Sequence, residues 1–275
     1  MENSSHTFFI AKNLSDIFSN IRNNSSLQIL GGCTRVSSYA ERCMSIRGIE
    51  ELQKIDKRER YIFLGPGVTL SEIMDIGRNH LPEVLYDALA TIGTPQVRNL
   101  ATLGGNICAP GQRLTLWAPL LALDARLEFK SQNATKYVDF NKFNGVPEKF
   151  ILTKIRIPIK EWNVSLFKRV GPSAKISPQS ASFVFLVDIQ KDQIVDIRIA
   201  FAGIPVFRSH ELENDMLSAH LPLSSKRITE LVEKAANIFT KLNAGVSVEL
   251  LLRTQFLNLL RYSLESLTGN GPVTL

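Results

Sequence analysis

Two pairs of adjacent glycines constrain this chain more than any other feature. Gly31–Gly32 follow the apolar segment Leu27–Leu30, and Gly104–Gly105 follow the largely apolar run Val97–Leu103. Because glycine has no Cβ atom, the backbone at such a pair can approach a ligand closely, and successive N–H groups can surround an anion. The two pairs therefore predict either two tight turns or the two sides of one phosphate-binding site.

Short polar side chains accompany both pairs. Thr34 follows the first pair, whereas Thr102 and Asn106 flank the second. Hydroxyl and amide groups donate hydrogen bonds, and phosphate oxygens accept them. This combination strengthens the hypothesis of a pyrophosphate held from both sides, but two plain turns remain the open alternative.

Short strands and helices alternate in the N-terminal part of the chain. Asn13 has the position of an N-cap, and Thr69 with Glu72 has the spacing of a capping box. Gly65–Gly67 begins like G-x-G-x-x-G, but Leu70 occupies the third glycine position, so the Rossmann fingerprint is incomplete. The pattern predicts strands at Thr7–Ala11, Leu27–Leu30, Tyr61–Leu64 and Phe150–Ile157, helices from Asn13 to about Ile21, from Thr69 to about Asn79 and over Glu83–Leu89, and an element of either type over Leu120–Phe129.

The C-terminal part has a different pattern. Ser182–Val187 and Ile194–Phe201 are apolar or alternating runs separated by a polar turn, which predicts an antiparallel pair. Ser225–Leu242 and Val248–Leu267 carry apolar residues at helical spacing. Strands followed by two long helices indicate a separate α+β unit, with a boundary near Glu161–Leu166.

Composition excludes several classes of protein. The net charge of +6 is spread over the chain of 275 residues rather than collected in blocks, which argues against a nucleic-acid partner. The 3 cysteines contain no C-x-x-C, which argues against a disulfide framework, a zinc site or an iron–sulfur cluster held by this chain. No apolar run reaches the roughly 18 residues of a membrane span, and residues 1–6 lack the start of a signal peptide. We therefore expect a cytoplasmic protein.

Catalytic machinery of its own is not visible in the sequence. The 4 histidines have no metal-ligand spacing, and the chain contains neither a Walker A motif nor a G-x-S-x-G nucleophile motif. We predict no catalytic residue and no metal ligand. Such a chain is typical of proteins whose chemistry is carried by a bound cofactor.

The stretch Ile92–Ile107 reads I-G-T-P-Q-V-R-N-L-A-T-L-G-G-N-I. It closely resembles the signature (V/I)-R-N-x-A-T-(I/L)-G-G-N-I of the FAD-binding subunit or domain of molybdenum hydroxylases, the group of xanthine dehydrogenase, carbon monoxide dehydrogenase and aldehyde oxidase. Further segments resemble the same family in the same order, namely Ile29–Thr34, Gly65–Ile73, Ala118–Ala125, Leu152–Pro158 and Phe167–Gly171.

The resemblance implies an α+β protein of two domains. Residues 1–163 would form an FAD-binding α/β domain of the vanillyl-alcohol oxidase (PCMH) type, with subdomains of about 1–55 and 56–163. Residues 164–275 would form an α+β C-terminal domain with an antiparallel sheet and helices. Carried over by position, the family's cofactor contacts fall on Leu30, Gly31, Gly32, Cys33, Thr34, Ile92, Thr102, Leu103, Gly104, Gly105, Asn106, Thr115, Leu152 and Lys168.

Two departures from the family pattern stand in the loops. Cys33–Thr34 replace the usual Thr-Asp, and the S-P-x-x-D after the second glycine pair is absent, so that Thr115 is the nearest counterpart of its Asp. The resemblance implies an electron-transfer subunit that takes electrons from a 2Fe-2S iron–sulfur subunit, whose own source is a large molybdopterin-binding subunit. The acceptor stays open between NAD, a quinone, oxygen and a protein. An FAD-free assembly subunit and a stand-alone flavin oxidase are the alternatives.

Overall fold

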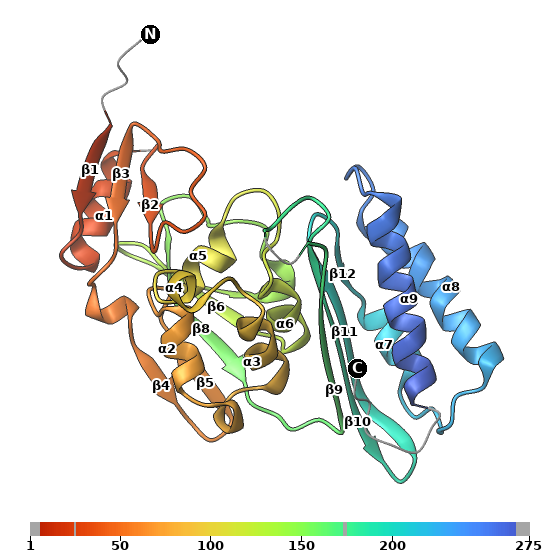
Figure 1. Ribbon diagram of the computed structural model, residues 1–275. Coiled ribbons are helices and arrows are strands. Elements are labelled where there is room, and N and C mark those ends of the chain that lie inside the picture. Colours follow the sequence, from red (N-terminus) through yellow and green to blue (C-terminus); the bar gives the residue numbers. More distant parts are fainter. Residues whose placement is uncertain (1–5, 25, 173–174, 268–275) are drawn as a thin grey trace. The chain divides into compact units, whose positions relative to one another are not determined.

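The computed structural model describes residues 6–24, 26–172 and 175–267, and these form two compact units (Figure 1). The first unit comprises the described parts of Met1–Leu81, Ile92–Ala109 and Asp124–Ile159. The second comprises those of Pro82–Thr91, Pro110–Leu123 and Lys160–Leu275. The predicted boundary between residues 163 and 164 stays a prediction, but the units are interleaved in sequence, whereas that prediction assumed continuous domains.

A small parallel sheet opens the first unit. Its strands β1 (Thr7–Ile10), β3 (Arg42–Ser45) and β2 (Gln28–Leu30) lie in the order β1-β3-β2, and both pairs are parallel. Helix α1 (Leu14–Asn23) connects β1 to β2, and its N-cap Asn13 accepts a hydrogen bond from the backbone N–H of Asp16. Ile17 of α1 and Met44 of β3 belong to one buried cluster, so the helix covers one face of this sheet.

A five-stranded antiparallel sheet forms the rest of the first unit. Its order is β4-β5-β8-β6-β7, and every neighbouring pair is antiparallel. The strands are β4 (Ile55–Lys57), β5 (Tyr61–Leu64), β6 (Arg126–Lys130), β7 (Thr135–Asp139) and β8 (Ile151–Pro158). Its other helical segments are η1 (Glu50–Leu52), α2 (Leu70–Asp75), η2 (Arg78–His80), α4 (Pro95–Arg98), α5 (Leu103–Cys108) and η3 (Phe140–Lys142).

The second unit is built on a four-stranded antiparallel sheet of order β12-β11-β10-β9. The strands are β9 (Val164–Val170), β10 (Ala181–Gln190), β11 (Gln193–Ala202) and β12 (Val206–Arg208). The helices are α3 (Glu83–Ala90), α6 (Trp117–Ala122), α7 (His210–Met216), α8 (Ser225–Leu242) and α9 (Leu250–Ser266). Phe183 and Phe201 pack with Phe239 and Phe256 of α8 and α9 on one face, while α3 and α6 cover the other (Figure 1).

Most elements predicted from local pattern are confirmed. The predicted capping box is present, because the Thr69 side chain accepts a hydrogen bond from the N–H of Glu72 and the Glu72 carboxylate accepts one from the N–H of Thr69. Ser225–Leu242 is helical over its whole predicted length. Ser182–Val187 and Ile194–Phe201 lie in β10 and β11, which pair as expected. The prediction of a mixed helix-and-sheet protein is confirmed at that level.

Several predictions from the sequence are wrong in detail. Arg42–Ser45, for which the sequence predicts no element, forms β3, the central strand of the parallel sheet. The helix begun at Thr69 ends at Asp75 rather than near Asn79. Leu120–Phe129 is neither one helix nor one strand, because α6 ends within it and β6 begins.

Within the described part of the chain, no helix is long and apolar enough to cross a membrane. Residues 1–5, on which the prediction about a signal peptide chiefly rests, lie outside the described residues.

Candidate functional site

The two glycine pairs contact each other's segments within the first unit. A Cβ atom built on Gly32 would lie 1.6 Å from the carbonyl oxygen of Leu100, and one on Gly31 would lie 2.7 Å from Oγ1 of Thr102. Atoms that are not bonded do not approach so closely, since carbon contacts are optimal near 3.5–4.0 Å. The first pair must therefore be glycine for its loop to lie against the segment that precedes the second pair.

The second pair is braced by the turn that follows β5. The N–H of Leu103 donates to the carbonyl of Val68 at 2.9 Å, and the N–H of Gly104 donates to that of Pro66 at 2.8 Å. A Cβ atom on Gly104 would lie 2.6 Å from Cβ of Pro66. The stretch that begins like a dinucleotide motif thus supports the second glycine pair in place of a ligand.

The second glycine pair lies in a helix, which corrects the prediction of a loop there. Thr102 is the N-cap of α5, and its Oγ1 accepts a hydrogen bond from the N–H of Gly105 at 3.2 Å. The N–H of Asn106 donates to the carbonyl of Thr102 at 3.0 Å. Since the N–H groups of Leu103 and Gly104 are also engaged, the backbone of this pair has no donor left for an anion.

The first glycine pair leads into an open loop. Among the residues that the structure describes, none accepts a hydrogen bond from the backbone N–H groups of Gly32, Cys33 and Thr34. Cys33 is left-handed with a φ of 56°, and both Cys33 and Thr34 are exposed. Successive N–H groups around a left-handed residue form a concave anion-binding nest. Of the two pairs, the first is therefore the one followed by backbone donors that have no acceptor among the described residues.

Hydrogen bonds from β2 hold the segment after this loop. The side chain of Gln28 accepts from the N–H of Ala40 at 2.9 Å and donates to the carbonyl of Ser38 at 3.3 Å. Tyr39 packs edge-on against Phe8 of β1, with ring centres 5.4 Å apart. Both ends of the loop are thus fixed to the parallel sheet, because Leu30 before it is buried in that sheet.

Two further predicted residues lie in the same unit. Leu152 is buried on β8 beside a β-bulge, where Phe129 pairs with Leu152 and Glu128 with Lys154. The extra residue is Thr153, whose hydroxyl donates to the buried Glu128 carboxylate at 2.7 Å. Ile92 is half-buried, and its carbonyl accepts a hydrogen bond from Arg98 at 3.0 Å.

Thr115 and Lys168 belong to the second unit. Thr115 is buried just before α6. Lys168 is half-buried on β9, and by strand alternation it shares a face with Leu166 and Val170, which pack on the core of α8 and α9. The role of both residues stays a prediction.

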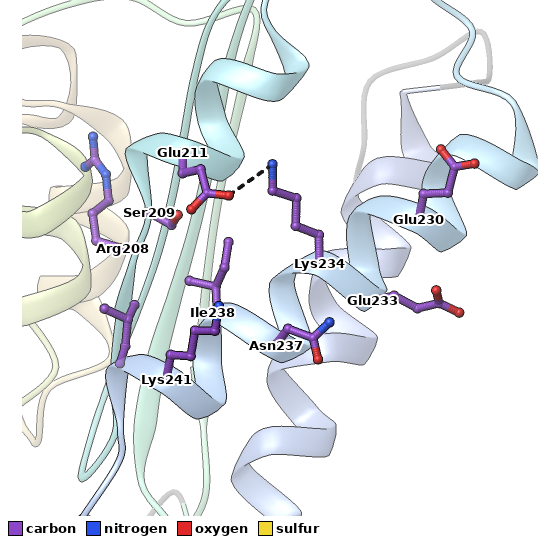
Figure 2. Close-up of a pocket in the computed structure, with 10 residues that line it drawn as sticks. Arg208, Ser209, Glu211, Glu230, Glu233, Lys234, Asn237, Ile238 and Lys241 are labelled. Atoms are coloured by element: carbon purple, nitrogen blue, oxygen red, sulfur yellow. Dashed lines mark ion pairs between the residues drawn. The ribbon is translucent and has the colours of Figure 1, made fainter.

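A cavity of about 650 Å³ lies in the second unit beside α7 and α8 (Figure 2). It includes none of the predicted site residues. Its lining mixes acidic and basic side chains, and Lys234 pairs with Glu211 at 3.3 Å across it. In the described ranges no group of three or more His, Cys, Asp or Glu side chains is arranged to hold a metal ion.

Sequence reasoning missed the partners of the glycines. Pro66, Val68 and the carbonyl of Leu100 complete the site, and no side-chain chemistry marks them. The sequence points to these residues only indirectly, through Gly32 and Gly104. A glycine indicates that another segment approaches the backbone closely, but it does not show which segment that is.

Comparison with known proteins decides the family. Residues 3–160 match the family described as the FAD binding domain in molybdopterin dehydrogenase. The chain belongs to this family. The predicted resemblance is confirmed, and so is FAD as the cofactor.

Two curated relatives of this FAD-binding chain are named as a subunit or chain of a dehydrogenase. It is 30% identical over 152 residues to the xanthine dehydrogenase FAD-binding subunit of Escherichia coli O157:H7, covering 52% of each chain. It is 25% identical over 215 residues to the glyceraldehyde dehydrogenase medium chain of Sulfolobus acidocaldarius, covering 72% of this chain and 76% of that one. The match spans about half the length of the E. coli relative.

Solved structures share the fold of this FAD-binding chain. It is similar to a chain of the Cu,Mo-CO dehydrogenase in its cyanide-inactivated form, with a TM-score of 0.79, 17% identity and 97% of both chains covered. It is also similar to a chain of quinoline 2-oxidoreductase from Pseudomonas putida 86, with a TM-score of 0.75, 14% identity and coverage of 97% and 96%. At these identities the likeness shows the fold alone.

Proposed function

We propose that this chain is the FAD-binding electron-transfer subunit of a molybdenum-containing hydroxylase complex. The observation that carries the proposal is the exposed loop Gly32–Thr34, whose backbone N–H groups have no acceptor among the described residues and surround a left-handed residue. A loop of this kind fits the diphosphate of FAD, because successive N–H groups around a left-handed residue form a concave anion-binding nest. When bound, FAD supplies the capacity to exchange electrons singly or in pairs.

The chain's own residues would bind and position that diphosphate. The N–H groups of Gly32, Cys33 and Thr34 would donate to its oxygens. The Thr102 hydroxyl, whose oxygen already accepts from Gly105, keeps its proton free to donate to the same group. Gly104 would act indirectly, by letting α5 lie against Pro66 and so fixing Thr102 opposite the first loop.

We assign the other predicted contacts as part of the same proposal. Leu152 and Ile92 would supply apolar contacts, with Leu152 positioned by the bulge at Thr153. For Thr115 and Lys168, contact with FAD is proposed from the resemblance alone. We further propose that the first unit has the vanillyl-alcohol oxidase-like fold, supported by its parallel sheet with α1 and its five-stranded antiparallel sheet.

We propose a 2Fe-2S iron–sulfur subunit and a large molybdopterin-binding subunit as partners, with NAD among the candidate acceptors. The names of two relatives support this, since they denote an FAD-binding subunit and a medium chain. A cytoplasmic location remains a prediction from the sequence. This chain would position FAD between the donor subunit and the acceptor and would need no acid–base residue for that role.

A matched pair of substitutions tests the phosphate loop. Cys33→Asp and Cys33→Asn have nearly the same shape, and Asp and Asn both tolerate the left-handed conformation. Cys33 is exposed, so neither change should alter the melting temperature by more than a degree or two. The Asp carboxylate would stand beside the diphosphate, and like charges at such a distance repel. We expect Cys33→Asp to bind FAD at least about tenfold more weakly than Cys33→Asn in a fluorescence titration, with the difference shrinking at high salt.

Equal affinities of the two variants would contradict the placement of the diphosphate at this loop. No flavin binding by the wild-type chain would favour the alternative of an FAD-free assembly subunit. Substrate oxidation by the isolated FAD-loaded chain, free of iron and molybdenum, would favour a stand-alone oxidase.

A further inference from the structure

The five-stranded sheet of the first unit has one buried face and one open face. Side chains alternate along a strand, so Ile155 and Ile157 of β8 belong to one face and Lys154 and Arg156 to the other. Both isoleucines are fully buried, whereas Lys154 is exposed and Arg156 is half-buried. The strand register places further residues on the face of Arg156, which we call the open face, namely Asp56, Tyr61, Phe63, Arg126, Glu128, Tyr137 and Asp139.

Ion pairs on the open face leave an excess of positive charge. Two of its three carboxylates are each shared by two cations. The pairs are Arg58 with Asp56 at 2.9 Å, Lys130 and Lys154 with Glu128 at 3.5 and 3.9 Å, and Arg126 and Lys142 with Asp139 at 2.9 and 3.7 Å. Arg156 adds a sixth cation to these five. This group of described residues therefore creates a positive potential over the sheet.

Arg156 lies on β8, the central strand of the sheet, and has no carboxylate partner among the described residues. Its Nε is buried without a hydrogen-bond partner, and its guanidinium carbon lies 3.8 Å from the centre of the Tyr61 ring. The residue directly opposite it on β6 is Arg126. Like charges directly opposite in an antiparallel pair are destabilising, so an anion bound at this pair would offset a cost that the sheet otherwise carries.

Arg126 can bind a second carboxylate. It donates to Asp139 through Nε at 2.9 Å, and among the described residues its two terminal nitrogens have no hydrogen-bond partner. Its side chain is about half exposed. An arginine donates through a fork of five N–H groups, of which one is used here. Both arginines of the pair therefore have donors available to the same ligand.

Cations already cover the aromatic rings of the open face. Arg58 and Lys154 lie 5.3 and 5.9 Å from the centre of the Phe63 ring, and Arg156 covers Tyr61. A nucleic-acid base needs a free aromatic face on which to stack. A carboxylate instead fits the fork of an arginine, which can donate two parallel hydrogen bonds to it. The open face therefore suits an acidic protein better than a nucleic acid.

The spacing of the two arginines favours a helix as the acidic element. Residues directly opposite each other in an antiparallel pair have Cβ atoms about 4.5–5.5 Å apart. On a helix, residues three or four positions apart have Cβ atoms about 5–6 Å apart. Two acidic residues one helical turn apart thus match Arg126 and Arg156, whereas residues on one face of a strand are roughly 6.6 Å apart.

We propose that the open face of this sheet is a docking surface for an acidic helix of a partner protein. Carboxylates one turn apart on that helix pair with Arg126 and Arg156, and the stacking on Tyr61 holds the Arg156 guanidinium in place for them. This inference goes beyond the proposed function, because the contact depends neither on FAD nor on the glycine pairs.

The test uses the full chain and two synthetic helical peptides as probes. One peptide is alanine-based with Glu at every fourth position, and the other has Gln at the same positions. In titrations followed by NMR spectroscopy of the isotope-labelled chain, we expect the Glu peptide to shift amide signals of β5, β6 and β8. Arg156→Gln should bind this peptide about three- to fivefold more weakly than wild type, because an exposed ion pair is worth up to roughly a factor of five. The difference should shrink at high salt.

Arg47→Gln is the matched control. Arg47 is an exposed arginine outside the open face, and it also has no ion pair among the described residues. This variant should bind the Glu peptide like wild type. Arg126→Gln, at an exposed position, should weaken binding as Arg156→Gln does, and it serves if Arg156→Gln does not fold. Equal affinity of wild type and the open-face variants, or equal binding of the Glu and Gln peptides, would overturn the proposal.

Two further measurements separate this surface from other occupants. Oligouridylate that binds more tightly than the Glu peptide, and loses affinity in Arg156→Gln, would overturn the acidic helix in favour of a nucleic acid. Arg156→Gln should bind FAD like wild type, and a loss of FAD affinity would place Arg156 in the cofactor site and overturn the docking surface. Because the peptide titrations need no flavin, a failure of the FAD proposal would leave their result unchanged.

Discussion

Replacing Gly32 by alanine tests whether the two glycine pairs depend on each other. The added Cβ would lie 1.6 Å from the Leu100 carbonyl oxygen and 2.5 Å from its carbon. To reach an ordinary contact distance of about 3.4 Å, the two backbones must separate by nearly 2 Å. Neither backbone can move freely, because Leu30 is buried in the parallel sheet and the N–H of Ala101 donates to the carbonyl of Val97 at 2.8 Å.

The cost follows from that displacement. Overpacking of a fixed contact typically costs about 1–3 kcal/mol. For a protein of this size each kcal/mol lowers the melting temperature by about 2–4 °C. We therefore expect Gly32→Ala to melt about 2–12 °C below wild type in calorimetry. FAD affinity should fall more than about tenfold, because the open loop moves away from Thr102.

Gly105→Ala is the matched control for this experiment. It has the same chemistry, but its Cβ would meet only Oγ1 of Thr102, at 3.1 Å. Alanine also gains up to about 1 kcal/mol over glycine inside a helix. We expect its melting temperature to equal or exceed that of wild type. Wild-type melting and wild-type FAD affinity in Gly32→Ala would refute the close approach of the two pairs.

Two other predictions concern buried groups. Arg208 and Glu213 form a buried ion pair at 2.8 Å, and Ile199 donates its N–H to the same carboxylate at 2.8 Å. Burial raises the pKa of Glu213 above its usual 4.5, so the folded state holds the carboxyl proton more tightly than the unfolded state does. The stability gained from that proton is present below the usual pKa and is lost as the pH rises through the raised pKa of the folded state. Arg208→Met should therefore cost about 3–5 kcal/mol at pH 7 in urea unfolding and less toward pH 4.5, and Glu213→Gln in the same chain should recover much of the loss. A cost independent of pH would contradict this. Desolvation raises the pKa of the half-buried Cys108 thiol to about 12, whereas Cys33 is exposed. A thiol reagent at pH 8 should therefore label Cys33 before Cys108, and equal rates would contradict the raised pKa of Cys108.

Most helices and strands of this protein were predictable from local signals in the sequence. The caps at Asn13 and Thr69 and the long amphipathic pattern after Ser225 predicted helices that the structure contains. Each depends on neighbours within a few residues, which is why a single sequence suffices. Strand β3 escaped prediction because Arg42–Ser45 mixes polar and apolar residues, and its place in the sheet depends on pairing with β1 and β2.

The candidate site was predictable only in part, for the same reason. A glycine pair indicates that a backbone is approached closely, but the approaching partner lies elsewhere in the chain. Gly104–Gly105 looked like a loop because glycine disfavours helices, yet the N-cap at Thr102 and the packing on Pro66 outweigh that propensity. The sequence therefore indicated that both pairs are approached closely, but it did not identify the segments that approach them.

The same dipeptide has two different physical roles in this protein. In the second pair the N–H groups are engaged by Pro66 and Thr102, so its glycines serve close packing. In the first pair the close packing on Leu100 leaves the following N–H groups open. The first role supports the second, since α5 holds in place the backbone against which Gly32 packs. A larger residue at Gly32 or Gly104, whose added Cβ would collide with Leu100 or Pro66, should therefore alter both stability and cofactor affinity, whereas a change at Cys33 should alter affinity alone.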